Sequence, residues 1–246
     1  FSNGVNGDKV GVSAGLNSLG NNGGPTDTCS LLGTSVAINM GKDALAPSTD
    51  QRAFGRNGTS DIGAFESNGI APPVSLLRAA SRKTHGTDVF DINLALSGTP
   101  TVESRTGGAG GDHTLVFTFS NTLSSVGGAT VTSGVASVSS SGIGFDAHEF
   151  IVNVTGAQNA QAITVGLTNV TDSLGHTGAS VSASLGLLLG DANGDAVVNS
   201  ADATITRNRS GLSTGATNFR VDYNLDGSIN SADATAVRSR SGTFIP

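Results

Sequence analysis

Apolar and polar residues alternate along the middle of the chain, from about residue 71 to residue 188. A period of two residues is typical of β-strands that bury one face, and turns rich in Gly, Ser, Asn and Asp separate the alternating stretches. The clearest stretches are 89–96, 113–120, 129–138, 149–155 and 162–170. Flanking strands are expected near Leu76, Val102 and Val181. The pattern predicts about seven or eight strands in an antiparallel β-sandwich.

A 21-residue segment occurs twice near the C-terminus. The first copy, DANGDAVVNSADATITRNRSG at residues 191–211, recurs as DYNLDGSINSADATAVRSRSG at residues 222–242, with 13 of the 21 aligned positions identical. In each copy a polar loop leads into a stretch with helical character, at 200–210 and 231–241, and then into Gly211 or Gly242, where a left-handed helix cap is expected. A duplication this close predicts two copies of one loop–helix unit.

Each copy opens with oxygen-bearing residues at a fixed spacing. Calcium is a hard cation, and a twelve-residue loop can surround it with oxygens from positions 1, 3, 5, 7, 9 and 12; position 7 acts through its backbone carbonyl and position 9 often through a water. The predicted ligands are Asp191, Asn193, Asp195, Val197, Asn199 and Asp202 in the first loop, and Asp222, Asn224, Asp226, Ser228, Asn230 and Asp233 in the second. Position 8 is apolar in both loops, and we expect Val198 and Ile229 to face each other across a short β-bridge.

Two Ca²⁺ ions are the cofactor that this pattern predicts. Without a cation, the three carboxylates of each loop repel one another by roughly 1–3 kcal/mol per pair. Metal binding should therefore drive folding of the repeat. The alternative interpretation is a pair of turns rich in Asp and Asn that hold no metal.

Several details separate the repeat from an ordinary EF-hand pair. Position 12 is Asp instead of Glu, Ala196 stands where Gly is preferred, and no clear helix precedes the first loop. With these features, residues 189–246, the tandem module, resemble the type I dockerin, a small α-helical module of paired F-hands. Dockerins bind calcium and plug into cohesin domains of extracellular assemblies.

The resemblance also implies a partner surface. In dockerins the contacts with cohesin centre on loop positions 10 and 11 and on the helix that follows. The matching residues are Ser200, Ala201, Arg207, Ser231, Ala232 and Arg238. Because the two faces are nearly identical, they would permit a partner to bind in either of two orientations. Two possibilities stay open: a cohesin-like partner in trans, or packing of the module in cis on its neighbouring domain.

The two regions before the tandem module carry weaker resemblances. Residues 69–188 resemble the Ig-like sandwiches that precede dockerin-like repeats in large bacterial surface proteins. Residues 1–68 contain LGNNGGPTDTCSLL at 19–32 and TDQRAFGRNGTSDIGAFE at 49–66. These strings resemble the final segment of the choice-of-anchor Q family, in which such a segment closes a secreted parallel β-helix. Asp50, Arg52 and Asp61 are expected to pair across this cap.

Composition and charge narrow the class of protein. The net charge of −6 and the absence of a clustered Lys/Arg face argue against a nucleic-acid partner. No apolar run approaches the ~20 residues of a membrane span. The chain opens at Phe1 without a signal-peptide pattern, so we expect a processed or truncated piece of a longer protein. The resemblances to secreted and surface proteins imply that it works outside the cell or at its surface.

One enzyme motif competes with the docking interpretation. Gly11-Val-Ser13-Ala-Gly15 fits the G-x-S-x-G nucleophile elbow of α/β-hydrolases, with His85 or His113 as a possible base. The elbow needs a buried strand before the serine and a helix after it, and the Gly- and Asn-rich flanks favour neither. The alternative function is a secreted esterase or polysaccharide-active hydrolase that uses Ser13.

The sequence thus predicts a mainly β, non-enzymatic chain with three parts. Residues 1–68 form the terminal segment of a parallel β-helix, residues 69–188 an Ig-like antiparallel β-sandwich, and residues 189–246 the dockerin-like module. The expected function is calcium-dependent docking or anchoring, which secures an upstream catalytic or adhesive region.

Overall fold

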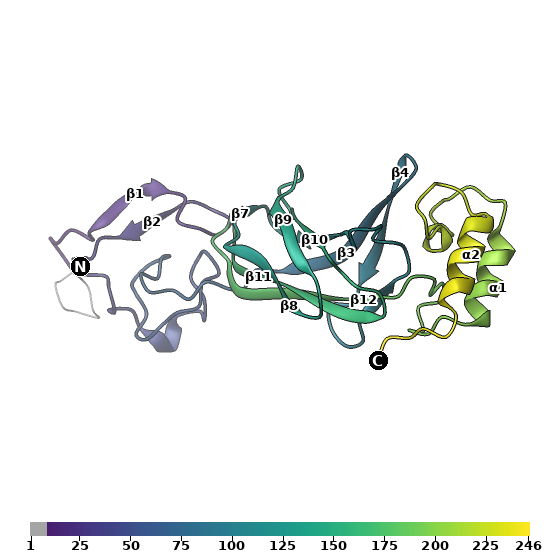
Figure 1. The fold of residues 1–246 in the computed structure, drawn as a ribbon. Helices are drawn as coiled ribbons and strands as arrows, with labels where there is room; N and C mark the ends of the chain where they lie inside the picture. The colour runs from purple at the N-terminus through teal and green to yellow at the C-terminus, as the bar shows by residue number, and fades with distance from the viewer. Residues whose placement is uncertain (1–8) are drawn as a thin grey trace. The chain divides into compact units, whose positions relative to one another are not determined.

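The computed structural model describes residues 9–246 and is mainly β, with two α-helices near the C-terminus (Figure 1). The chain divides into two compact units. The first comprises residues 1–74 and 171–177, and the second comprises residues 75–170 and 178–246. The tandem module and the strands that precede it therefore lie in the same unit. The division into three domains at residues 68 and 188 stays a prediction.

The first unit contains little regular structure. Strands β1 (Leu16–Gly20) and β2 (Thr28–Leu31) pair antiparallel, and a 3₁₀ turn covers Asp43–Leu45. The isolated bridges of this unit, at Thr49–Gly55 and Gly55–Ile70, are also antiparallel. Among the described residues of the first unit, no stacked parallel coils are therefore visible, and the β-helix end segment remains a prediction.

A buried arginine organises the loops of this unit. The Arg52 guanidinium lies 2.7 Å from the Asp50 carboxylate, and its central carbon lies 4.3 Å and 3.7 Å from the ring centres of Phe54 and Phe65. Burial alone would raise the pKa of Asp50, but hydrogen bonds from the Glu66 backbone and from Arg52 hold it below its usual value. Asp61 was expected in the same pairing. Its carboxylate instead accepts hydrogen bonds from the backbone N–H groups of Asn39 and Ser67.

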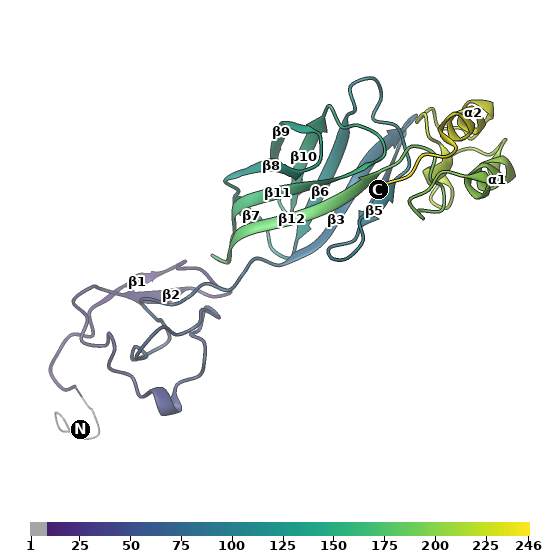
Figure 2. The same ribbon diagram turned by 60° about the horizontal axis from the view of Figure 1, so that its bottom comes forward.

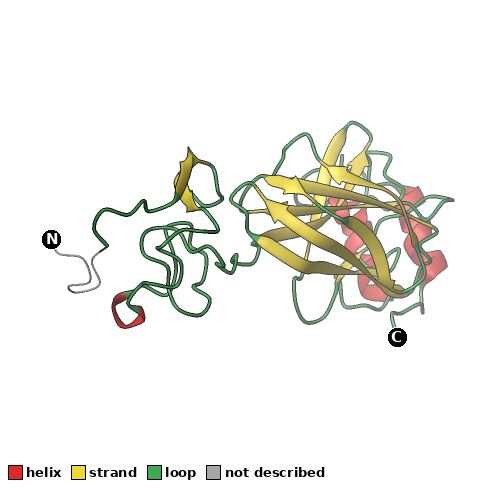
Figure 3. Ribbon diagram, turned by 90° about the vertical axis from the view of Figure 1, so that its left-hand side faces the viewer, coloured by secondary structure: helices red, strands yellow, loops and turns green. Residues whose placement is uncertain are grey.

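Two β-sheets of five strands each form the larger part of the second unit (Figure 3). The first sheet has the order β4-β3-β6-β10-β9 and is antiparallel throughout. The second has the order β5-β12-β11-β7, with β8 paired to β11, and its β5–β12 pair is parallel. The bounds are β3 (Leu76–His85), β4 (Asp88–Leu94), β5 (Thr101–Glu103), β6 (His113–Phe119), β7 (Leu123–Ser125), β8 (Gly128–Ser133), β9 (Ser137–Ile143), β10 (Glu149–Thr155), β11 (Gln161–Asp172) and β12 (Thr177–Leu187). We call residues 76–187, apart from the 171–177 turn, the two-sheet region.

The alternating pattern explains which side chains fill its core. In β10, Phe150, Val152 and Val154 are buried while the residues between them are half-buried, as a period of two requires. Val152 lies opposite Leu115 of β6, and both are fully buried. The predicted antiparallel strands are therefore present, whereas the assignment of an Ig-like topology remains a prediction.

The stretch 129–138 does not form the single strand that its alternation predicts. It is divided between β8, which pairs with β11, and β9, which pairs with β10 of the other sheet. The break falls at Gly134, whose φ of 81° lies in the left-handed region. A Cβ there would lie 2.5 Å from the carbonyl oxygen of Ala162. Glycine lets the chain turn at this point and cross from one sheet to the other.

Helices α1 (Ser200–Arg209) and α2 (Ser231–Arg240) lie side by side in the tandem module (Figure 2). Each begins at an asparagine N-cap, Asn199 or Asn230, with a complete capping box. Gly211 and Gly242 follow the helices with φ of 88° and 89°, so the predicted left-handed positions are confirmed.

Candidate metal centre

The first predicted loop encloses a buried carboxylate. Asp191, at position 1, is fully buried. Its Oδ1 accepts the N–H of Gly194 at 2.7 Å and its Oδ2 accepts that of Ala196 at 2.9 Å. Gly194 and Ala196 have φ of 78° and 66°, so the loop coils inward at positions 4 and 6. For Ala196 this left-handed conformation costs roughly 1–2 kcal/mol, and two hydrogen bonds to one carboxylate help to offset that cost.

The second loop has left-handed residues at the same positions, but Oδ1 of its first carboxylate accepts from position 5 instead of position 4. Fully buried Asp222 accepts the N–H of Asp226 at 3.2 Å on Oδ1 and that of Gly227 at 3.0 Å on Oδ2. Leu225 and Gly227, again at positions 4 and 6, have φ of 68° and 87°. The order of glycine and non-glycine residues is reversed between the loops, but the backbone path is retained.

Position 12 closes each loop and starts its helix. The Asp202 carboxylate accepts the N–H of Ala192 on Oδ1 and that of Asn199 on Oδ2, both at 2.9 Å. Asp233 accepts the N–H of Asn230 in the same way, at 2.9 Å. An aspartate at this position therefore joins the start of the loop to the first turn of the helix.

The remaining side chains of the loops are more exposed. The Asn193 amide donates to Asp195 at 2.8 Å, and the Asn224 amide donates to Asp226 at the same distance. The side-chain oxygens of Asn199 and Asn230 cap their helices, so position 9 is not free to turn fully toward an ion. The action of position 9 through a water stays a prediction.

The charges of the loops favour a cation. Burial raises the pKa of Asp191, and repulsion from Asp202 and Asp195 adds to the shift. Burial raises the pKa of Asp233 too, with a contribution from Asp222. A cation bound among these carboxylates would relieve the repulsion and favour their charged forms.

The oxygens of each loop are of several kinds. No group of three or more His, Cys, Asp or Glu side chains within residues 9–246 is arranged to hold a metal by itself. Calcium does not require such a group, because amide, backbone carbonyl and water oxygens also serve as its ligands. The donor set fits Ca²⁺ when the carboxylates act together with the Asn amides and the carbonyls at position 7.

The two loops do not pair with each other as expected at position 8. Val198 and Ile229 are both fully buried in a shared core, but their backbones bond elsewhere. The Val198 N–H donates to the carbonyl of Thr243, and the Ile229 N–H donates to the carbonyl of Leu212. Each loop thus pairs with the segment that follows the other helix. The prediction of a bridge between Val198 and Ile229 is therefore wrong, because these segments, and not the other loop, supply the backbone partners.

The core of the tandem module continues into the two-sheet region. Val102 of β5 and Leu188, just after β12, are buried in one cluster with Val198, Val221 and Ile229 of the module. Tyr223 is fully buried in the same cluster, where its hydroxyl lies 2.9 Å from that of Thr206. The module and the end of the sheets therefore share apolar packing.

Polar contacts also hold the tandem module on the two-sheet region, at what we call the junction. Arg220 donates to the carbonyl of Val102 at 2.9 Å, and the Ser104 hydroxyl donates to the carbonyl of Arg220 at 2.7 Å. The backbone N–H of Thr106 donates to the carbonyl of Tyr223 at 2.9 Å. The 3₁₀ turn Phe219–Val221 lies at the centre of these contacts. Packing in cis, one of the two possibilities open from sequence, is thus present in the structure.

His85, considered from sequence only as a possible base, takes part in this junction. It ends β3, is fully buried, and its Nδ1 lies 2.8 Å from Oδ2 of Asp222. Burial lowers the pKa of His85, and the hydrogen bond to Asp222 opposes that shift. The two residues are 137 positions apart, and no sequence pattern marks their contact.

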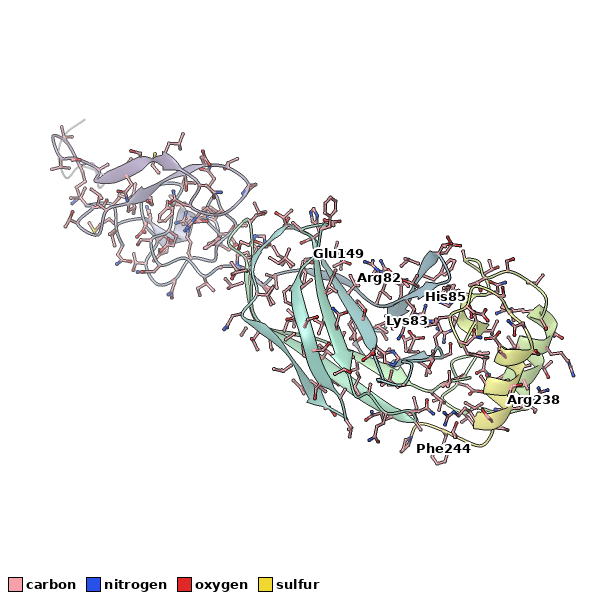
Figure 4. The ribbon with its side chains drawn as sticks, turned by 45° about the horizontal axis from the view of Figure 1, so that its top comes forward. Arg82, Lys83, His85, Glu149, Arg238 and Phe244 are labelled. Atoms are coloured by element: carbon pink, nitrogen blue, oxygen red, sulfur yellow. The ribbon has the colours of Figure 1, made fainter. Side chains whose placement is uncertain are left out.

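The six predicted partner-binding residues all remain exposed: Ser200, Ala201 and Arg207 on α1, and Ser231, Ala232 and Arg238 on α2. Packing in cis therefore leaves both helix faces open (Figure 4 labels Arg238). Contact in cis and an exposed surface on both helices are therefore compatible.

The surroundings of Ser13 differ from those of a nucleophile elbow. Ser13 is exposed, its Oγ accepts the N–H of Gly15 at 3.2 Å, and the strand β1 follows it where an elbow has a helix. The two possible bases, His85 and His113, belong to the other compact unit.

Comparison with known proteins gives one family match. Residues 189–240 match the model of the Dockerin type I domain, and the matched part is 52 of 246 residues. Comparison with curated proteins and with solved structures gave no match. Among residues 9–246, no helix is long and apolar enough to cross a membrane. Dockerin domains are non-catalytic docking modules that bind calcium and typically bind cohesin, and the C-terminal part of this chain is similar to them.

Proposed function

We propose that the tandem module binds two Ca²⁺ ions, one in each loop, and presents α1 and α2 to a cohesin-like partner. The ligands are the twelve residues at positions 1, 3, 5, 7, 9 and 12 of the two loops. Support comes from the equal backbone paths of the loops and from the raised pKa values of Asp191 and Asp233. Bound calcium would fix the start of each helix, because Asp202 and Asp233 belong both to a loop and to a capping box.

The observation that carries the docking proposal is the exposure of the same three residues on each helix. Ser200, Ala201 and Arg207 on α1 have exposed counterparts in Ser231, Ala232 and Arg238 on α2. The buried side of the module packs on the two-sheet region. The module is thus held in cis while its helices stay available in trans.

The regions that precede the tandem module would connect this docking surface to the rest of a longer protein. We propose that the two-sheet region is an Ig-like spacer and that residues 1–68 end a secreted β-helix. In that arrangement the protein acts outside the cell or at its surface. The docking surface then secures whatever catalytic or adhesive region the longer protein carries.

Binding to a panel of type I cohesin domains tests the docking proposal. Arg207→Glu and Arg238→Glu should each leave affinity within about twofold, because the other orientation remains available. The double variant should lose at least about 30-fold, since removing a buried interfacial charge partner costs about 2 kcal/mol or more. Surface plasmon resonance with and without EGTA measures all of these values.

Lys42→Glu serves as the matched control, because it makes the same charge change outside the tandem module. It should bind like the parent protein. Failure of every cohesin domain to bind the calcium-loaded chain, or equal affinity of the parent and the double variant, would contradict docking through these faces.

A further inference from the structure

The two calcium loops carry the same residues at positions 1, 3, 5, 9 and 12, but their first carboxylates have different surroundings. Among the described residues, hydrogen bonds to the Asp191 carboxylate come only from its own loop. Asp222 accepts two further hydrogen bonds on Oδ2, from the Thr214 hydroxyl and from Nδ1 of His85, each at 2.8 Å. Thr214 belongs to the tandem module, whereas His85 belongs to β3 of the two-sheet region. Figure 4 shows His85 at the end of the sheets next to the module.

The network around His85 defines its role as a donor. Its Nε2 lies 3.1 Å from Nη1 of Arg105. A guanidinium can only donate hydrogen bonds, so Nε2 is the acceptor and the ring proton is on Nδ1. His85 therefore donates to the carboxylate of Asp222, and its orientation is set from the side opposite the loop.

Hydrogen bonds also fix the side chain of Arg105, which supports the His85 ring. It is buried, and its Nε and Nη2 donate to the two carboxylate oxygens of Glu103 at 2.7 and 2.6 Å. Nη1 also donates to the carbonyl of Phe90, and Nη2 also donates to the carbonyl of Ser81, each at 2.9 Å. All five N–H groups of the guanidinium thus have acceptors. Such a fully bonded group has little freedom to release His85.

Aromatic and backbone contacts keep the ring and the loop together. The rings of Phe90 and Phe219 stack at 5.1 Å, and the His85 ring meets each of them edge-on, at 5.3 and 6.1 Å. The next residue, Gly86, donates its N–H to the carbonyl of Leu225 in the second loop at 3.0 Å. The hairpin between β3 and β4 therefore contacts the second loop through both a side chain and the backbone.

These contacts orient the metal-facing carboxylate. Oδ2 of Asp222 accepts three hydrogen bonds, from His85, Thr214 and Gly227, whereas Oδ1 accepts one at 3.2 Å from Asp226. The donors on Oδ2 fix the rotation of the carboxylate and leave Oδ1 as the oxygen with free capacity for an ion. Groups that orient a ligand in this way commonly change metal affinity by about 10–100-fold.

We propose that the two-sheet region completes the second calcium site, with His85 as the positioning residue for Asp222. This inference rests on the proposed calcium function and goes beyond it, because it makes two sites with the same side-chain ligands unequal. The first site is built within the tandem module. The second is built jointly by the module and the sheets, so calcium there also tightens the junction, since coupling between binding and packing is reciprocal.

Calcium titration calorimetry on the full chain, with one loop disabled at a time, tests this proposal. Asp195→Ala and Asp226→Ala change the same exposed loop position, so they form a matched pair of backgrounds. With the first loop disabled, His85→Leu should raise the calcium Kd by at least about tenfold. With the second loop disabled, the same substitution should change Kd by less than about threefold, because the hydrogen bonds of the His85 ring go to Asp222 and Arg105 and not to the first loop.

Two further variants separate positioning from general packing. His85→Asn keeps an N–H donor near the place of Nδ1 and should recover most of the lost affinity. Phe90→Leu disturbs the same ring stack without removing the donor and should stay within about threefold of the parent background. Circular dichroism in saturating calcium checks that each variant is folded.

The outcomes distinguish this inference from the calcium function itself. The role of His85 would be overturned if His85→Leu weakened calcium binding equally in both backgrounds or in neither. It would also be overturned if His85→Asn did not recover calcium affinity, or if Phe90→Leu lost as much affinity as His85→Leu. If the parent chain binds no calcium, the proposed function fails and the inference fails with it.

Discussion

Removing calcium with EGTA is expected to unfold the tandem module and abolish most of the helical signal of the chain. At free calcium about 1,000 times Kd, each site stabilises the folded module by about 4 kcal/mol, so the two sites together contribute about 8 kcal/mol. This exceeds half of the stability of many domains. The metal-free loops would also retain the repulsion among Asp191, Asp195 and Asp202.

Far-ultraviolet circular dichroism and thermal melts measure this effect. Among residues 9–246, α1 and α2 are the only α-helices, so the helical signal reports on the module. The two sheets have buried residues of their own, such as Leu115, Val152 and Ile163, and should keep their β signal. Mg²⁺ added with EGTA serves as the control and should not restore the helices, because it demands near-ideal octahedral geometry. Unchanged helicity without calcium would contradict metal-driven folding.

Arg105→Leu is expected to produce the second-largest effect, a loss of about 3–5 kcal/mol in the free energy of unfolding. Both Arg105 and Glu103 have fully buried side chains, and their closest N–O distance is 2.6 Å. Burial alone would raise the pKa of Glu103, but the charge and hydrogen bonds of Arg105 hold it at about 2. Without the Arg105 guanidinium, the Glu103 carboxylate must take up a proton or remain charged while buried. Either outcome costs stability.

Urea unfolding in saturating calcium measures this loss. The double variant Glu103→Gln/Arg105→Leu is the matched comparison, because it removes the stranded charge and should recover part of the stability. Arg78→Leu is the second control. Arg78 is more than a third exposed beside Asp91, so its replacement should cost no more than about 1 kcal/mol. If Arg105→Leu lowers the free energy of unfolding by less than about 1 kcal/mol, the Glu103–Arg105 pair does not stabilise the end of the sheets.

The repeat near the C-terminus made the tandem module predictable. Identical residues at positions 1, 3, 5, 9 and 12 define the loops, and the same Asn and Asp residues reveal the helix starts. Asn199 and Asp202 illustrate this, because they form the capping box of α1. Local spacing was sufficient here, since each loop is closed by hydrogen bonds between residues close in sequence.

Contacts between distant segments were not predictable from local patterns. The alternation across Gly134 gave no sign that β8 and β9 belong to different sheets. The pairing of Val198 with Thr243 replaces the expected bridge to Ile229, because the segment after α2 returns along the first loop. His85 lies in a strand whose pattern predicts only a β-sheet, and its partner Asp222 follows 137 residues later.

The junction between the tandem module and the two-sheet region restricts the orientation of a docked partner. A module on a free linker would let a bound partner take many orientations relative to the rest of the chain. Here the shared core around Val102, Leu188 and Val221 and the contacts of Arg220 and His85 restrict that freedom. A partner bound to α1 and α2 would therefore be held at a defined orientation to the two sheets.

Isothermal titration calorimetry of Ca²⁺ into the metal-free chain tests the central claim most directly. We expect two ions per chain, each bound more tightly than about 10⁻³ M, the weak limit for extracellular calcium modules. Asp191→Ala and Asp222→Ala should each remove one ion, and the double variant should bind none. A parent chain that takes up no calcium, or a double variant that still binds two ions, would contradict the assignment of these loops as calcium sites.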